Sequence, residues 1–206
     1  MSPPTGLTSL LADPGADIEA IAAWLDRRDP PDRLAALRGL GRDEQRALYD
    51  RAGAAAPLDL AFFVGEAAAR GEVVHDGINT LPLPAPLRRF QKRFSRPEHG
   101  SPRLFGYNEG PTRRVIGPGY FVALATAGRA SWTDRGGVVI DYFQVPDGSV
   151  PPGWPPVVDN DRRLQRFVYH RTRDFMRRVS AHVSIGAAWK SERALDHYFV
   201  LCRRDD

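Results

Sequence analysis

Nine residues near the carboxyl end of the chain alternate strictly between apolar side chains and polar or small ones. Val179, Ala181, Val183, Ile185 and Ala187 are apolar, and Ser180, His182, Ser184 and Gly186 stand between them. Successive side chains of a β-strand point to opposite sides, so this period of two predicts a strand with one buried and one polar face. A second apolar run, 197–203, follows a short polar turn. The chain is therefore expected to end in an antiparallel hairpin.

Short β-branched or aromatic runs precede this hairpin. They occupy 104–107, 120–124 and 138–143, and glycine and proline residues separate them. Such runs between turn residues are typical of antiparallel strands. We therefore expect one antiparallel sheet, formed mainly by 103–145 and 179–203.

The first part of the chain has a helical pattern. Ile18, Ile21 and Leu25 recur at helical spacing behind Asp17, which is a suitable N-cap. Two more short helices are expected before 57, and the apolar and basic residues of 87–96 predict a basic amphipathic helix. The expected organisation is a mobile lead (1–16), a helical N-terminal subdomain (17–96) and a β-rich domain (97–206). The predicted fold class is α+β, with short N-terminal helices packed on a mainly antiparallel sheet.

Several classes of site are absent from the sequence. A single cysteine, Cys202, excludes an intramolecular disulfide and a cysteine-based zinc site. The five histidines lack metal-binding spacing, and there is no GxSxG, Walker A or GxGxxG motif, so neither a metal nor a cofactor is predicted. No apolar stretch approaches the roughly 20 residues of a membrane span. The expectation is a soluble cytoplasmic protein without a membrane partner.

The charge of the chain does not identify a binding partner. The net charge is +4, and the excess of basic residues lies in the second half of the chain. Of the 29 basic residues, 27 are arginines, which we interpret as the coding bias of a GC-rich, bacterial-like genome. The arginine-rich segments 88–96 and 171–178 would suit phosphate contacts. The modest total charge favours solvated helix faces instead, so nucleic acid is not the expected partner.

The polar aromatic groups of the second half indicate a candidate ligand site. Hydrogen-bonding side chains with apolar bodies are typical of concave binding sites. The candidates are Tyr107, Asn108, Glu109, Tyr120, Asp141, Tyr142, His170, Arg171, Arg173, His182 and Tyr198. Arg171 or Arg173 would neutralise a carboxylate or phosphate, and Tyr107, Arg171 and His182 are expected to share one cavity.

Three functions follow from these candidates. The first is binding of a small anionic ligand or a protein partner through the β-rich half. The second is an enzyme whose acid–base groups come from His170, His182, Glu109 and Asp141. The third is a nucleic-acid-associated factor that uses the arginine-rich segments.

Overall fold

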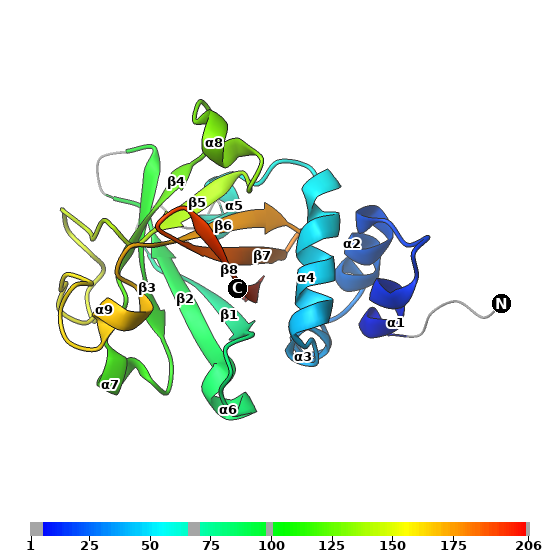
Figure 1. Ribbon diagram of the computed structural model, residues 1–206, viewed down its shortest axis with the longest axis horizontal. Helices are drawn as coiled ribbons and strands as arrows, with labels where there is room; N and C mark the ends of the chain where they lie inside the picture. The colour runs from blue at the N-terminus through cyan, green and yellow to red at the C-terminus, as the bar shows by residue number, and fades with distance from the viewer. Residues whose placement is uncertain (1–5, 66–70, 98–100, 205–206) are drawn as a thin grey trace.

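Eight strands in the described part of the chain form a closed antiparallel barrel (Figure 1). The computed structural model describes residues 6–65, 71–97 and 101–204. Each strand pairs with its neighbours in sequence, and the pairing of β1 with β8 closes the barrel. The strands are β1 (Val73–Asn79), β2 (Arg89–Ser95), β3 (Arg103–Glu109), β4 (Phe121–Ala125), β5 (Val138–Asp141), β6 (Thr172–Arg178), β7 (Val183–Lys190) and β8 (Arg193–Arg203).

Four helices lie against one side of this barrel (Figure 1). They are α1 (Leu7–Ala12), α2 (Ile18–Asp26), α3 (Pro30–Arg38) and α4 (Arg42–Arg51), and the 3₁₀ turn η1 (Ala52–Ala54) follows them. The Asp17 carboxylate accepts a hydrogen bond from the Ala20 N–H, as expected for the N-cap of α2. Leu48 of α4 belongs to the same buried cluster as Ile185 and Val200, so the helices cover the outer face of β7 and β8.

The predicted open sheet is wrong, because the strands close on themselves. In the alternating segment 179–187, one buried and one polar face is predicted, but residues 183–187 are covered on both faces. Val183, Ile185 and Ala187 face outward into the cluster beneath the helices, whereas Ser184 is fully buried and Gly186 lies against the Phe199 ring. Both faces of β7 are therefore covered. The strand also begins later than expected, since the N–H groups of Val179 and Ser180 bond back to the Val183 carbonyl in a turn.

The helix expected over 87–96 is also wrong. Only α6 (Ala85–Arg88) is helical there, and β2 follows it directly. Phe90 and Phe94 are four residues apart, a spacing that places side chains on one face of a helix and equally on one face of a strand. Lys92 lies between them and is buried on the same face. Strand β2 thus belongs to the barrel, although it falls within the segment expected to be a basic helix.

Within the segment expected to be a mobile lead, residues 7–12 form the helix α1. Leu7, Leu10 and Leu11 of α1 are buried against the other helices. The Arg51 guanidinium of α4 donates to the backbone carbonyls of Leu10 and Leu11, each at 3.0 Å. This apolar and polar anchoring fixes α1. Residues 1–5 lie outside the described part of the chain.

The two ends of the barrel differ. The segment around α5 (Ala61–Val64) closes one end, where the Phe63 ring lies 4.7 Å from the Phe94 ring. The helix α8 (Ala130–Thr133) stands in the β4–β5 connection. The helices α6, α7 (Arg113–Ile116) and α9 (Gln165–Val168) belong to connections at the other end. Among the described residues, no helix combines the length and apolar character needed to cross a bilayer.

Candidate ligand cavity in the barrel lumen

A cavity of about 380 Å³ occupies the lumen at the end of the barrel that carries α6 and α7. Its walls are mainly apolar, since the segment before β2 contributes Leu81, Leu83 and Leu87 and strand β8 contributes Leu195 and Phe199. Small-molecule sites commonly have volumes of about 300–1,000 Å³ and mostly apolar walls with a few polar groups. The size and lining therefore suit a compact organic molecule.

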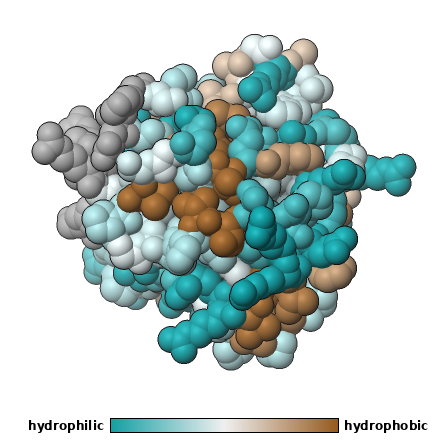
Figure 2. All heavy atoms as spheres, turned by 90° about the vertical axis from the view of Figure 1, so that its left-hand side faces the viewer, coloured by the Kyte–Doolittle hydropathy of each residue, from teal (hydrophilic) through white to brown (hydrophobic). Residues whose placement is uncertain are grey.

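Apolar side chains also surround the mouth of this cavity. Leu83, Leu87 and Val168 line the cavity and remain 39%, 39% and 37% exposed. Figure 2 shows hydrophobic patches within a hydrophilic surface on the side of the molecule that carries α7 and α9. An apolar molecule that enters the cavity would meet these side chains first.

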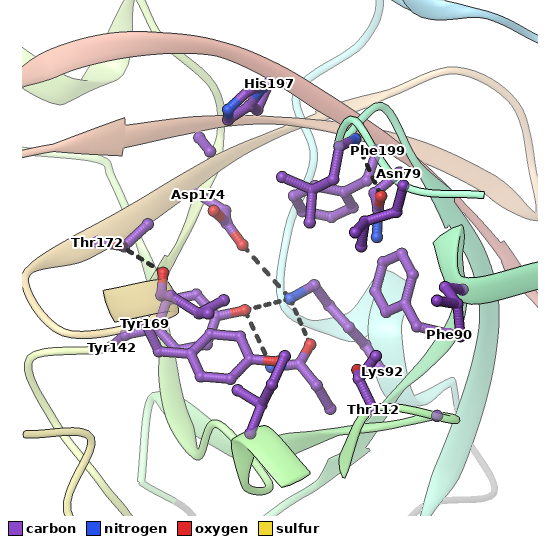
Figure 3. A pocket seen from close by; sticks show the side chains of 18 of the residues that line it. Asn79, Phe90, Lys92, Thr112, Tyr142, Tyr169, Thr172, Asp174, His197 and Phe199 are labelled. Carbon is purple, nitrogen blue, oxygen red and sulfur yellow. Dashed lines mark hydrogen bonds and ion pairs between the residues drawn. The ribbon is translucent and has the colours of Figure 1, made fainter. Parts of the chain in front are cut away.

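A buried lysine forms the floor of the cavity (Figure 3). Lys92 of β2 is 1% exposed, and its Nζ donates to Asn108 Oδ1 at 2.9 Å, to the Tyr142 hydroxyl and to Asp174 Oδ2 at 3.3 Å. Asn108 lies on β3, Tyr142 directly follows β5, and Asp174 lies on β6. Residues on β2, β3 and β6 and directly after β5 therefore form one polar cluster. We call it the Lys92 cluster: Lys92, Asn108, Tyr142 and Asp174.

Aromatic rings enclose the ammonium group. Its Nζ lies 4.8 Å from the ring centre of Phe199, 5.0 Å from that of Phe121 and 5.1 Å from that of Tyr142. Faces of aromatic rings attract cations electrostatically, so these rings replace part of the water that the ammonium loses. The Tyr169 ring stacks on the Tyr142 ring, with the ring centres 5.2 Å apart, and both rings line the cavity.

Burial changes the acid–base properties of the Lys92 cluster. It lowers the pKa of Lys92 to about 8, against the opposing attraction of the Asp174 carboxylate. Burial also raises the pKa of Asp174 above its usual range, although the Lys92 charge counteracts that rise. The pKa of the Tyr142 hydroxyl is raised for the same reason, so that phenol stays protonated. The free-energy difference between the ion pair and the neutral pair of amine and acid is therefore smaller than it would be in water.

Four of the residues predicted from the sequence line the cavity. They are Asn108, Glu109, Tyr142 and Tyr198. The Glu109 carboxylate accepts a 2.7 Å hydrogen bond from Arg113 Nε at the mouth. The Tyr198 ring also packs 5.7 Å from the Tyr49 ring of α4, which places it at the margin of the lumen.

Four other predicted residues face away from the lumen. The Tyr107 and Tyr120 rings lie 5.6 Å apart and pack with Trp154 on the outer surface of β3 and β4. Asp141 and Arg173 form an outer ion pair, with Arg173 Nε 3.3 Å from Asp141 Oδ1. The neighbours of three of these residues do line the cavity: Asn108 beside Tyr107, Tyr142 beside Asp141 and Asp174 beside Arg173.

The last three predicted residues do not join the cavity. His170 and exposed Arg171 lie in the turn before β6, and neither is among the lining residues. His182 lies just before β7, near the end of the barrel that α5 closes. Tyr107, Arg171 and His182 are therefore not brought together in this cavity.

Sequence reasoning missed the two charged members of the Lys92 cluster. Lys92 was assigned to the solvated side of a helix, and Asp174 was not considered. The signal for Lys92 was available, because Phe90, Lys92 and Phe94 have the period of a strand and lysine is rare in this chain. In the described ranges, no group of three or more His, Cys, Asp or Glu side chains is arranged to hold a metal ion.

Comparisons with protein-family models, curated proteins and solved structures found no match to this chain. The functional argument therefore depends on the cavity and on its side chains.

Proposed function

We propose that this protein binds a small, largely apolar molecule in the barrel lumen, with one polar group of that molecule beside the Lys92 cluster. The observation that carries the proposal is the cavity of about 380 Å³ with mainly apolar walls and the Lys92 cluster at its floor. Eight-stranded barrels have a lumen that side chains can fill or that can hold one small ligand. Here the lumen is filled toward α5 and hollow toward α6.

The pairing of the charges favours an uncharged polar group on the ligand. The Lys92 ammonium is paired with Asp174, and the Arg113 guanidinium is paired with Glu109. An anionic ligand would have to compete with these carboxylates in a site of low dielectric, where an unpaired charge is costly. A carbonyl or hydroxyl group would avoid that cost. The anionic ligand expected from the sequence is thus replaced by a neutral one.

The two alternative functions have less support. The acid–base groups considered for an enzyme do not converge, since Glu109 lines the cavity, Asp141 faces outward and His182 lies near the closed end. The nucleic-acid alternative relied on arginine-rich helices over 88–96 and 171–178, where the chain forms β2 and β6 instead.

The proposal is tested with two uncharged apolar alcohols of different shape, 2-naphthalenemethanol and 1-octanol. Ala188 of β7 lines the cavity, so Ala188→Phe should fill part of it and weaken binding by about tenfold or more, or about 1.4 kcal/mol. Ala194 of β8 is exposed and does not line the cavity, so Ala194→Phe is the matched control. Binding is measured by equilibrium dialysis. Absence of saturable binding of both alcohols, or equal affinity of wild-type protein and Ala188→Phe, would contradict the proposal.

A further inference from the structure

The type of cation on the cavity floor is informative. Of the 29 basic residues of this chain, two are lysines, Lys92 and Lys190. Arginine is the usual choice for buried ion pairs and stays protonated in proteins, whereas lysine can release its proton and become an amine nucleophile. A chain in which 27 of the 29 basic residues are arginines has a lysine at the cavity floor. This choice points to amine chemistry.

The neighbours of Lys92 suit that chemistry. Nζ lies at the boundary between the cavity and the packed lumen, within hydrogen-bonding reach of the Asp174 carboxylate and the Tyr142 hydroxyl. A carboxylate can accept a proton from nitrogen, and a phenol can donate one to oxygen. Lys190, in contrast, lies at the end of β7, outside the cavity lining, and donates to the Phe167 carbonyl at 3.3 Å.

We propose that Lys92 forms a reversible imine with an apolar aldehyde or ketone held in the cavity. This inference rests on the proposed ligand binding and names the chemical class of the ligand. The unprotonated amine attacks the carbonyl carbon, a C–N bond forms and the C–O π bond breaks. The oxygen gains one proton and the nitrogen loses one, which gives a carbinolamine.

The second stage releases water. The hydroxyl group of the carbinolamine leaves with one more proton, and the remaining nitrogen proton is lost as the C=N bond forms. One carbonyl compound and one amine thus give one imine and one water, and neither oxidant nor reductant is consumed. Asp174 accepts the nitrogen proton and Tyr142 supplies the proton to the departing oxygen, after which the proton passes from Asp174 back to Tyr142.

The electrostatics of the site support this step. With a pKa of about 8 in place of 10.5, Lys92 holds about two orders of magnitude more free amine at neutral pH than an ordinary lysine. Desolvation in an apolar pocket is a recognised way to activate a lysine nucleophile. The apolar walls also limit the access of water that would hydrolyse the imine.

The test uses 2-naphthaldehyde and sodium cyanoborohydride with the full chain, because the reductant converts an imine into a stable secondary amine. Peptide mass spectrometry then locates the naphthylmethyl group. We expect labelling of Lys92 to exceed that of Lys190 by about tenfold or more, given that one pKa unit is a factor of ten in free amine. Labelling of Lys92 should rise as the pH increases through about 8, and excess 2-naphthalenemethanol should suppress it.

The variants separate the two lysines. Lys190→Arg should leave labelling of Lys92 unchanged, and Lys92→Met should abolish it. Should Lys92→Met fail to fold, the distribution of label in wild-type protein still decides the question. Tyr142→Phe should slow labelling of Lys92, because it removes the proton donor and keeps the ring.

The outcomes also distinguish this inference from the proposed function. Label confined to Lys190 and the α-amino group, in a protein that binds 2-naphthalenemethanol, would refute the imine and leave ligand binding intact. Absence of both label at Lys92 and alcohol binding would refute both. Label at Lys92 that the alcohol does not suppress would also overturn the inference, because the aldehyde would then reach the amine without occupying the cavity.

Discussion

Acidification should destabilise this protein through one histidine at the closed end of the barrel. His75 of β1 is 0% exposed, and its Nε2 lies 2.9 Å from the Phe63 carbonyl oxygen. The rings of Phe63 and Phe94 lie 5.5 and 5.0 Å from the imidazole, and Arg203 adds a nearby positive charge. Nε2 donates to the carbonyl, and Nδ1 has no hydrogen-bond partner in the described residues. The ring is therefore held in its neutral form.

The size of the effect follows from the pKa of His75. Burial is the main cause that lowers this pKa from 6.5 to about 4. Between these values the unfolded chain binds a proton that the folded chain does not, so the stability present above pH 6.5 is lost as the pH falls toward 4. The difference of 2.5 units corresponds to about 3 kcal/mol. Most of this loss should be complete at pH 4.5.

The assay compares the free energy of unfolding in urea at pH 7 and pH 4.5, followed by tryptophan fluorescence. His75→Gln keeps a neutral N–H donor near the Phe63 carbonyl and cannot gain the proton. Wild-type protein should lose about 2–3 kcal/mol more than this variant on acidification. In the control variant His170→Gln, His75 is intact, so the acid-induced loss should equal that of wild type. Equal losses in wild type and His75→Gln would refute the reasoning.

Two further predictions concern the barrel interior. Lys92→Met and Asp174→Leu should each lower the free energy of unfolding by about 3–5 kcal/mol because each leaves a buried partner unpaired, and the double variant should lose less than the sum. Urea unfolding of all four proteins measures this coupling, and additive losses would show that the pair does not interact. Val183→Asp and Ser184→Asp should each lower the free energy of unfolding by several kcal/mol, because both faces of β7 are buried. The same change at an exposed position, Ala194→Asp, should lower it little. Thermal melts decide this, and a Ser184→Asp melting temperature close to that of wild type would show that the lumen face is hydrated.

The strands could be predicted from the sequence far better than their closure. Alternation at Val183 and Ile185 identified β7 but could not say that its apolar face points away from the lumen. Barrel closure depends on pairs such as His75 with Arg203, which are far apart in sequence and leave no local pattern. Once the two edge strands, β1 and β8, pair with each other, the strands have an outer face. The part of that face beneath the helices is a second core.

The site residues expected from the sequence include positions on both faces of the barrel wall. Tyr107 and Asn108 are neighbours, as are Asp141 and Tyr142, and Arg173 and Asp174. In each pair the first residue faces outward and the second faces the lumen. Adjacent strand positions point to opposite sides, so a choice between them requires the register of the whole barrel, which the sequence does not provide.

His75 and Lys92 are buried in the lumen with lowered pKa values, and their surroundings differ. His75 is enclosed by Phe63, Phe94 and the α5 segment, so no ligand can approach it and its role is in packing. Lys92 stands where the packed lumen ends and the cavity begins. Buried ion pairs contribute little net stability compared with apolar side chains of similar size. A solid apolar floor would therefore stabilise the barrel at least as well, so the Lys92–Asp174 pair fits the ligand binding that we propose for this cavity.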